Sequence, residues 1–169
     1  MARDHARVML SIWSDGDFKA LAKDAQRMYL VLLTQPSLRY CGVLDYLPSR
    51  LARLATDETE DDVEKAVATL AETSHVIVDY ETSEALIRTY IRHDGLLSSP
   101  NMVKAMLKDR SQVISDMLRI AIDNELSKAF QADPKAPGWK GFKAADPVLY
   151  ETLSHPIAGK GSRKGSGKG

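Results

Sequence analysis

Two β-rich segments, residues 75–80 and 85–91, stand in a sequence whose other apolar residues mostly recur at helical spacing. The polar residues 81–84 separate the two segments. Two such runs joined by a short polar loop predict a β-hairpin. We therefore expect a mainly helical protein with one small β-hairpin, which is an α+β fold.

Three amphipathic helices are predicted ahead of this hairpin. Apolar residues recur at i, i+3, i+4 and i+7 over residues 18–33, and a similar stripe covers residues 63–73. Between them, Pro48 is placed to open a short helix over residues 47–55, because proline suits the first helical position. These three segments supply most of the helix expected in the first half of the chain.

Two short strands are also expected in this half. Residues 41–46 form a β-rich stretch entered through Gly42, and residues 8–13 show a short alternating pattern. The expected order is strand, helix, strand, helix, helix and hairpin. This order predicts a winged helix-turn-helix, in which residues 48–73 form the helix-turn-helix and residues 75–92 form the wing.

Polar residues that can accept a hydrogen bond from a first helical turn mark the helix starts. Asp24 is a candidate N-cap for the first helix. At the third helix, Asp57 with Glu60 three residues later fits a capping box loosely, and Thr59 is the competing cap. The sequence leaves these two alternatives open.

A helical unit is expected after the hairpin, over residues 99–130. Ser99 and Pro100 read as an N-cap followed by a proline in the first helical position. A long apolar stripe then runs over residues 102–126. One long helix, or two helices with a break near residues 109–111, explains this stripe.

The apolar stripe of this unit needs a partner surface. It either folds back on the winged-helix domain, residues 1–95, or forms a homodimer through residues 101–126. Residues 131–157 are a Pro- and aromatic-rich extension in which Asp146 is expected to cap a short helix. Residues 158–169 are rich in Gly, Ser, Lys and Arg and predict a disordered basic tail.

Six short sequence segments within the first 108 residues resemble those of a known protein family. Three lie ahead of the expected helix-turn-helix, at residues 2–7 (ARDHAR), 11–18 (SIWSDGDF) and 25–30 (AQRMYL). The others belong to the expected strand and wing, at residues 41–44 (CGVL), 76–79 (VIVD) and 87–95 (IRTYIRHDG). Together they resemble a group of actinobacteriophage winged-helix proteins, described as helix-turn-helix DNA-binding or replisome-organiser-like replication-initiation proteins.

The resemblance implies a protein that binds double-stranded DNA in the replication initiation or transcriptional regulation of a bacteriophage. A phage-encoded protein of this kind would act in the host cell cytoplasm. The resemblance indicates no particular DNA sequence as the target.

The distribution of charge bears on this expectation. Lysine plus arginine and aspartate plus glutamate both total 23, so the formal net charge is zero. However, residues 56–84 carry ten carboxylates and one lysine. Six of these carboxylates crowd the start of the expected recognition helix, which normally faces the DNA bases. Because carboxylates repel phosphates, base reading by this helix is the use that the sequence favours least.

Cations elsewhere in the chain are candidates for contact with DNA. The arginines at 50 and 53 share one side of the second helix, and those at 88 and 92 have the even spacing that places them on one sheet face. A basic tail adds sequence-independent affinity. An ordinary surface or salt-bridge role is the alternative for each arginine. The candidate DNA-binding residues are Arg50, Arg53, Lys65, Arg88, Arg92, Lys160, Arg163 and Lys164.

A second hypothesis assigns the acidic residues to a protein-interaction module. In it, Asp57, Glu58, Asp61 and Glu64 dock a basic surface of a replication or transcription protein. A capped and solvated helix start is the simpler interpretation of the same residues, because carboxylates stabilise a helix N-terminus. Both interpretations remain open.

No sequence pattern is typical of an enzyme, a metal site or a cofactor site. The four histidines are scattered, and the single cysteine, Cys41, is expected to be a small core residue. No apolar stretch approaches the ~20 residues that a membrane-spanning helix needs. We therefore expect a non-enzymatic cytoplasmic protein that uses no cofactor.

Overall fold

The computed structural model describes residues 6–93 and 95–154. Over these residues the protein is mainly helical and contains one three-stranded antiparallel sheet. This confirms the prediction of a mainly helical protein with a small β component. The tail predicted for residues 158–169 lies outside the described residues, and so do Lys160, Arg163 and Lys164.

The described chain begins with a 3₁₀ helix, η1 (Leu10–Ser14), so the strand expected at residues 8–13 is wrong. The side chains of Leu10 and Trp13 are 88% and 57% exposed, so the alternating pattern does not separate a buried face from a solvated one. Without a partner strand, the backbone forms local hydrogen bonds, such as Ile12 N to Met9 O at 3.0 Å.

The next two helices show how local capping differs from the prediction. Asp15 is the N-cap of α1 (Gly16–Ala20), where its carboxylate accepts a hydrogen bond from the Phe18 amide. The longer α2 (Lys23–Leu33) starts after Ala22, which supplies no side-chain cap. The prediction that Asp24 caps this helix is therefore wrong, and Asp24 lies in the first turn, where its charge suits the helix dipole.

A short strand and a pair of helices follow. Strand β1 (Val43–Asp45) leads into α3 (Pro48–Leu51), which has Pro48 in its first turn as predicted and continues as the 3₁₀ helix η2 (Ala52–Leu54). Helix α4 (Glu60–Glu72) then starts at a capping box. Of the two candidate caps, Thr59 is confirmed, and its partner in the box is Asp62.

The predicted hairpin is confirmed as β2 (Val76–Asp79) and β3 (Glu84–Ile87). Strand β3 lies in the centre of the sheet, which has the order β1-β3-β2, and all four of its residues are buried. The second strand is shorter than predicted because the chain turns into the single-turn helix α5 (Tyr90–His93).

The remaining chain is helical. After the 3₁₀ helix η3 (Leu96–Ser98), the apolar stripe is divided between α6 (Pro100–Ser111) and α7 (Asp116–Ala132), with the break just beyond the predicted position. The extension forms α8 (Gly138–Ala145) and α9 (Pro147–Ser154). Asp146 caps α9 as predicted, because its carboxylate accepts a hydrogen bond from the Leu149 amide.

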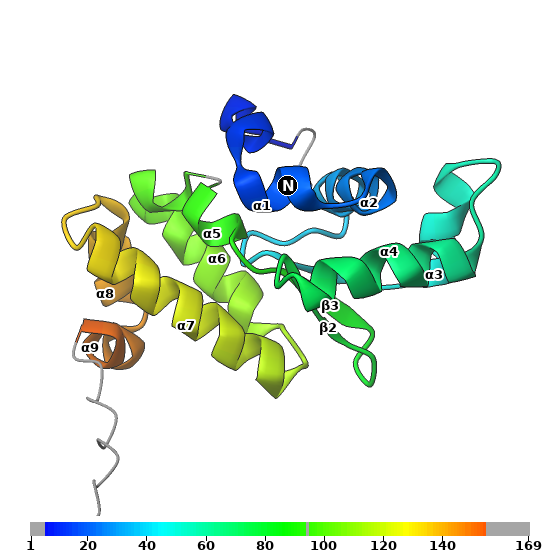
Figure 1. Cartoon of the computed structure of the whole chain (residues 1–169). Coiled ribbons are helices and arrows are strands. Elements are labelled where there is room, and N and C mark those ends of the chain that lie inside the picture. The colour runs from blue at the N-terminus through cyan, green and yellow to red at the C-terminus, as the bar shows by residue number, and fades with distance from the viewer. Residues whose placement is uncertain (1–5, 94, 155–169) are drawn as a thin grey trace, which may run out of the picture.

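Figure 1 shows helices α6 to α9 on one side of the molecule and α2, α3 and α4 on the other, with the hairpin between them. One cluster of buried apolar side chains runs through both sides, from Phe18 to Leu153. It includes Val43 and Leu86 of the sheet and Leu118 of α7. The apolar stripe of α6 and α7 therefore packs within the chain. The predicted domain division between residues 95 and 99 stays a prediction.

Two glycines allow α8 to pack closely against η3 and the start of α6. A Cβ atom on Gly141 would lie 2.7 Å from the Cα atom of Pro100, and one on Gly138 would lie 2.9 Å from the Cα atom of Leu97. Both distances are shorter than the contacts that a Cβ atom makes in proteins, and the backbone cannot move aside as a flexible side chain can. The packing between these helices therefore depends on small residues at both positions.

We predict that Gly141→Ala lowers the free energy of unfolding by a net amount of about 1–2 kcal/mol. Overpacking typically destabilises a protein by ~1–3 kcal/mol. The higher helix propensity of alanine offsets up to ~1 kcal/mol of this loss. Denaturant unfolding followed by circular dichroism measures the change. Gly16→Ala is the matched control, because a Cβ atom there meets nothing within 4 Å. Equal stability of the two variants would contradict the close packing of α8.

Candidate functional site

The two arginines of the predicted helix-turn-helix, Arg50 and Arg53, are exposed to solvent. Arg50 lies in α3 and Arg53 in η2, three positions further along the chain. Neither side chain forms a hydrogen bond or an ion pair with any residue in the described part of the chain. Both guanidinium groups are therefore available to a ligand from solvent.

The start of α4 presents acidic side chains to solvent. Asp57, Asp61 and Glu64 are exposed, and Lys65 forms an ion pair with Asp61 one turn away. Glu58 differs, because it is largely buried and its carboxylate lies 2.5 Å from Arg27 of α2. The surface at the start of α4 is therefore acidic, and Lys65 within it is already paired.

The two arginines of the predicted wing meet at a buried carboxylate. β3 ends at Ile87, so Arg88 and Arg92 do not share a strand face, and that part of the prediction is wrong. Both instead contact Glu125 of α7, which is 2% exposed. Arg88 Nη1 donates a hydrogen bond of 3.1 Å to Oε1, and Arg92 Nε lies 3.0 Å from Oε2 in an ion pair.

Lys128 completes this group, which we call the Glu125 cluster (Glu125, Arg88, Arg92 and Lys128). Its ammonium donates a hydrogen bond of 2.7 Å to Glu125 Oε1 from the next turn of α7. A carboxylate this deeply buried is stable only when it is paired, and three cations supply the pairing. The Glu125 cluster therefore fixes α7 to the end of the hairpin.

A second buried carboxylate joins the same elements. Glu84 at the start of β3 is 2% exposed and accepts hydrogen bonds from the amides of Ile114 and Ser115, at 3.1 and 2.9 Å. These amides stand just ahead of α7, where helix N–H groups lack partners within the helix. Arg39 lies 3.2 Å from the other carboxylate oxygen. The hairpin thus also holds the start of α7.

The sequence analysis missed both glutamates. The signal for Glu125 is its position on the apolar face of α7, which also carries Leu118, Ile122 and Ala129 at helical spacing. A charged residue on such a face is seldom buried without a partner. Glu84 gives a weaker signal, because it stands at the end of the polar loop, where an exposed acid is expected.

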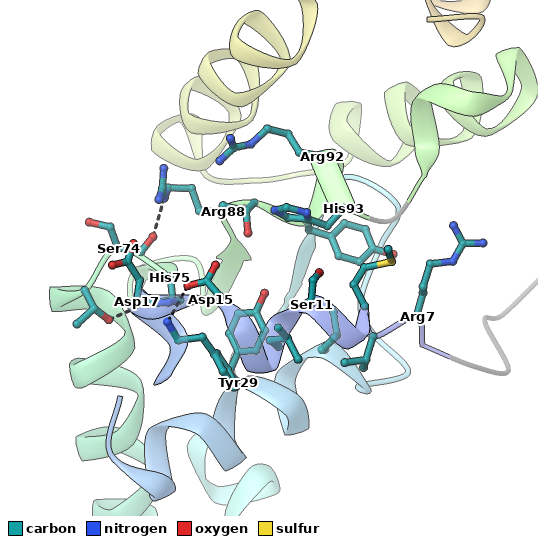
Figure 2. A pocket seen from close by; sticks show the side chains of 18 residues that line it. Arg7, Ser11, Asp15, Asp17, Tyr29, Ser74, His75, Arg88, Arg92 and His93 are labelled. Atoms are coloured by element: carbon teal, nitrogen blue, oxygen red, sulfur yellow. Dashed lines mark hydrogen bonds between the residues drawn. The ribbon is translucent and has the colours of Figure 1, made fainter. Parts of the chain in front are cut away.

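A cavity of about 350 Å³ lies where the N-terminal helices face the hairpin and α5. We call it the N-terminal cavity. Figure 2 shows Arg88, Arg92 and His93 along one side of it and Asp15, Ser11 and Tyr29 along the other. The cavity therefore combines hydrogen-bond donors, carboxylates and aromatic rings in one place.

Two titratable groups of this region have shifted pKa values. The Phe18 amide donates a hydrogen bond to Asp15 and holds the pKa of that carboxyl below its usual range, so Asp15 is ionised at neutral pH. Burial raises the pKa of the Tyr29 hydroxyl, which therefore stays protonated and can donate a hydrogen bond.

The described residues also bear on metal binding and nucleophilic chemistry. Across residues 6–93 and 95–154, no group of three or more His, Cys, Asp and Glu side chains is placed to hold a metal ion. Cys41 is fully buried, and burial raises the pKa of its thiol to about 11, so it is not a reactive thiolate at neutral pH. None of the helices in the described part of the chain is long and apolar enough to cross a membrane.

Comparisons of this chain with family models, with curated proteins and with solved structures found no match.

We predict that Glu125→Gln lowers the free energy of unfolding by about 1–3 kcal/mol. The amide keeps the shape of the side chain but leaves two arginines without their counter-charge. These arginines are 30% and 36% exposed, so partial rehydration limits the loss. Chemical denaturation measures it.

Asp116→Asn is the control for this prediction. It breaks the exposed pair between Asp116 and Arg119 on the same helix and should change stability by less than about 0.5 kcal/mol. If both variants lose the same amount of stability, the Glu125 cluster is not what fixes α7 to the hairpin.

Proposed function

We propose that the chain is a non-enzymatic winged-helix protein that binds duplex DNA through phosphate contacts made from α3. The arrangement of elements supports this proposal. Helices α3 and α4 stand between β1 and the β2–β3 hairpin, and the sheet has the order β1-β3-β2. This arrangement suits a helix-turn-helix followed by a wing.

The observation that carries the proposal is the exposure of Arg50 and Arg53 without partners in the described part of the chain. Arginine fits phosphate oxygens well because its guanidinium donates hydrogen bonds in a planar fork. By contrast, Lys65 is paired with Asp61, and Arg88 and Arg92 share the buried Glu125 and line a cavity away from α3. We therefore assign the phosphate contacts of the described residues to α3 and η2, and further contacts to Lys160, Arg163 and Lys164.

This division of roles makes the binding independent of DNA sequence. Phosphate contacts position a protein on DNA but carry no direct sequence information. Base reading would bring the start of α4 into the major groove, and Asp61 and Glu64 would oppose it. A role in replication initiation or transcriptional regulation follows from the family resemblance, and the host cell cytoplasm is the matching location.

We predict that the full chain binds duplex DNA with a Kd of roughly 1–100 μM that rises with salt concentration. Arg50→Ala together with Arg53→Ala should weaken binding about fivefold, because each exposed ion pair with a phosphate contributes about 0.5 kcal/mol. The slope of log K against log salt should become shallower by about 1.8, at ~0.9 for each phosphate that the variant no longer neutralises. Fluorescence anisotropy of a labelled duplex at several salt concentrations measures both quantities.

The control for this experiment removes two exposed cations from the opposite side of the molecule. Lys135→Ala with Lys140→Ala changes the net charge by the same amount near α8. An equal loss of affinity in this variant would show that overall charge, and not α3, governs binding. No binding by the wild-type chain at low salt would overturn the proposal.

The charge of α4 favours a second candidate function, which is docking of a basic protein surface. Asp57, Asp61 and Glu64 are exposed around the start of this helix, and only Lys65 opposes them. Opposite charge steers association and selects partners. A basic surface of a replication or transcription protein is the partner that this chemistry fits.

We predict that Asp61→Lys with Glu64→Lys has opposite effects on the two candidate functions. It should abolish binding of a decalysine peptide, which stands in for a basic surface, and it should strengthen binding to duplex DNA. Calorimetry with the peptide and anisotropy with the duplex measure the two affinities. Asp116→Lys with Asp133→Lys reverses the same number of exposed charges at the two ends of α7, away from α4, and should leave peptide binding unchanged. Retained peptide binding after the α4 reversal contradicts docking at this face.

A further inference from the structure

The N-terminal cavity is formed by segments distant in sequence. Its walls come from the region around η1 and α1, from α2, from the turn between α4 and β2, and from the stretch between β3 and α5. Its volume of about 350 Å³ lies in the range typical of small-ligand sites, which is roughly 300–1,000 Å³. The cavity does not include Arg50, Arg53 or the start of α4, so it is separate from both surfaces proposed above.

One wall presents guanidinium groups that are fixed from behind. Arg88 donates from Nε to the Ser74 carbonyl at 2.6 Å and from Nη1 to Glu125 at 3.1 Å. Arg92 is held to Glu125 through Nε. Arg88 Nη2 and both Nη atoms of Arg92 form no hydrogen bond with the residues that the structure describes. Because Glu125 is outside the cavity lining, it positions both side chains without blocking them.

These free nitrogens suit a phosphate group. Guanidinium donors pair with phosphate oxygens through charge-assisted hydrogen bonds, which are stronger than neutral ones. The side chains are held in place before a ligand arrives, so little conformational entropy is lost on binding. His93 lies on the same side of the cavity and adds a further ring nitrogen (Figure 2).

The opposite wall has a different chemistry. Asp15 and Asp17 contribute carboxylates, and Asp15 is ionised because the Phe18 amide holds its pKa low. A carboxylate accepts hydrogen bonds from amino and hydroxyl groups but repels phosphate. A ligand that is anionic over its whole length would therefore be repelled by this wall. The cavity fits a ligand with a phosphate at one end and hydrogen-bond donors at the other.

Aromatic rings also line the cavity. Tyr29 and His75 pack edge to face, with ring centroids 6.0 Å apart, and both line the cavity with Tyr90 and Phe18. Aromatic rings of this kind bind flat bases by stacking or edge contacts. Donors to a phosphate, aromatic rings and carboxylate acceptors together match the parts of a nucleotide.

We propose that the N-terminal cavity binds a single nucleotide unit, with its phosphate at Arg88 and Arg92 and its base or sugar donors at Asp15 and Asp17. The unit comes either from a free nucleoside monophosphate or from the phosphorylated 5′ end of a nucleic acid strand. Both sources present the same chemistry to the cavity.

Titration of the full chain with adenosine 5′-monophosphate tests the proposal. Saturable binding with a Kd below about 1 mM is expected, and the Nε–H signals of Arg88 and Arg92 should shift in NMR spectra. Adenosine, which lacks the phosphate, should bind at least about tenfold more weakly, since it cannot form the charge-assisted hydrogen bonds. No saturable binding by the wild-type protein, or equal binding of adenosine, overturns the proposal.

Two variants separate ligand binding from structural support. Arg92→Gln removes a cation that lines the cavity and should weaken nucleotide binding about tenfold. Lys128→Ala removes a cation that contacts the same Glu125 but does not line the cavity, so nucleotide binding should stay unchanged. Equal weakening in the two variants would assign the effect to the Glu125 cluster alone and overturn the proposal.

Competition identifies the source of the nucleotide. A short single-stranded oligonucleotide with a 5′ phosphate should displace adenosine 5′-monophosphate if strand ends bind, whereas the unphosphorylated oligonucleotide should not. Displacement supports a strand end as the source, and its absence supports a free nucleotide. Displacement by the unphosphorylated strand alone contradicts recognition of the phosphate. The Arg50→Ala, Arg53→Ala variant should bind the nucleotide normally, so this experiment is independent of the duplex-binding proposal.

Discussion

The ion pairs of Glu125 with Arg88 and Arg92 are the interaction on which the position of α7 against the hairpin depends. Removing a carboxylate from water is costly, and the cost is met only when its partners are close and well placed. Here the partners come from two places, with Arg88 and Arg92 at the end of the hairpin and Lys128 on α7 itself. Glu84 provides the reciprocal link, from the sheet to the start of α7. A displacement of α7 would therefore leave charged groups without partners at both Glu84 and Glu125. These contacts thus fix the position of the helix on the sheet.

This arrangement also decides which charges remain available at the surface. Glu125 offsets only one of the three positive charges that meet it, so the end of the hairpin keeps a net positive charge, and Arg88 and Arg92 present it to the N-terminal cavity. The start of α4 stays acidic because Lys65 only offsets Asp61. A net charge of zero thus describes a molecule with separate regions of opposite character. The exposed cations of α3 and η2 are Arg50 and Arg53, and for this reason we assign the proposed contacts with duplex DNA to them.

Local features of the fold could be predicted from the sequence, whereas the charged contacts between elements could not. The positions of Pro48, Thr59 and Asp146 follow from rules that act within one helical turn. The partners of Glu125 lie more than thirty residues away for Arg88 and Arg92, and no local pattern pairs them. The strand predicted at residues 8–13 failed for a related reason. Alternation indicates a strand only where a sheet is present to bury one face, and neighbouring strands are a tertiary feature. The N-terminal cavity is lined by four segments that are distant in sequence, so it could not be predicted from local patterns either.

The apolar stripe of α6 and α7 is continuous in the sequence, but only part of it is buried in the fold. Its larger part is buried within the chain, in the same cluster as the sheet. Ile114, Met117 and Ile120 remain exposed, at a spacing of three residues around the start of α7. The same turn that Glu84 holds thus carries an apolar ridge on its outer side. Homodimerisation through residues 101–126 stays a prediction. Because Glu84 and Glu125 hold α7 from the inner side, a second copy could bind this ridge without any rearrangement of the fold.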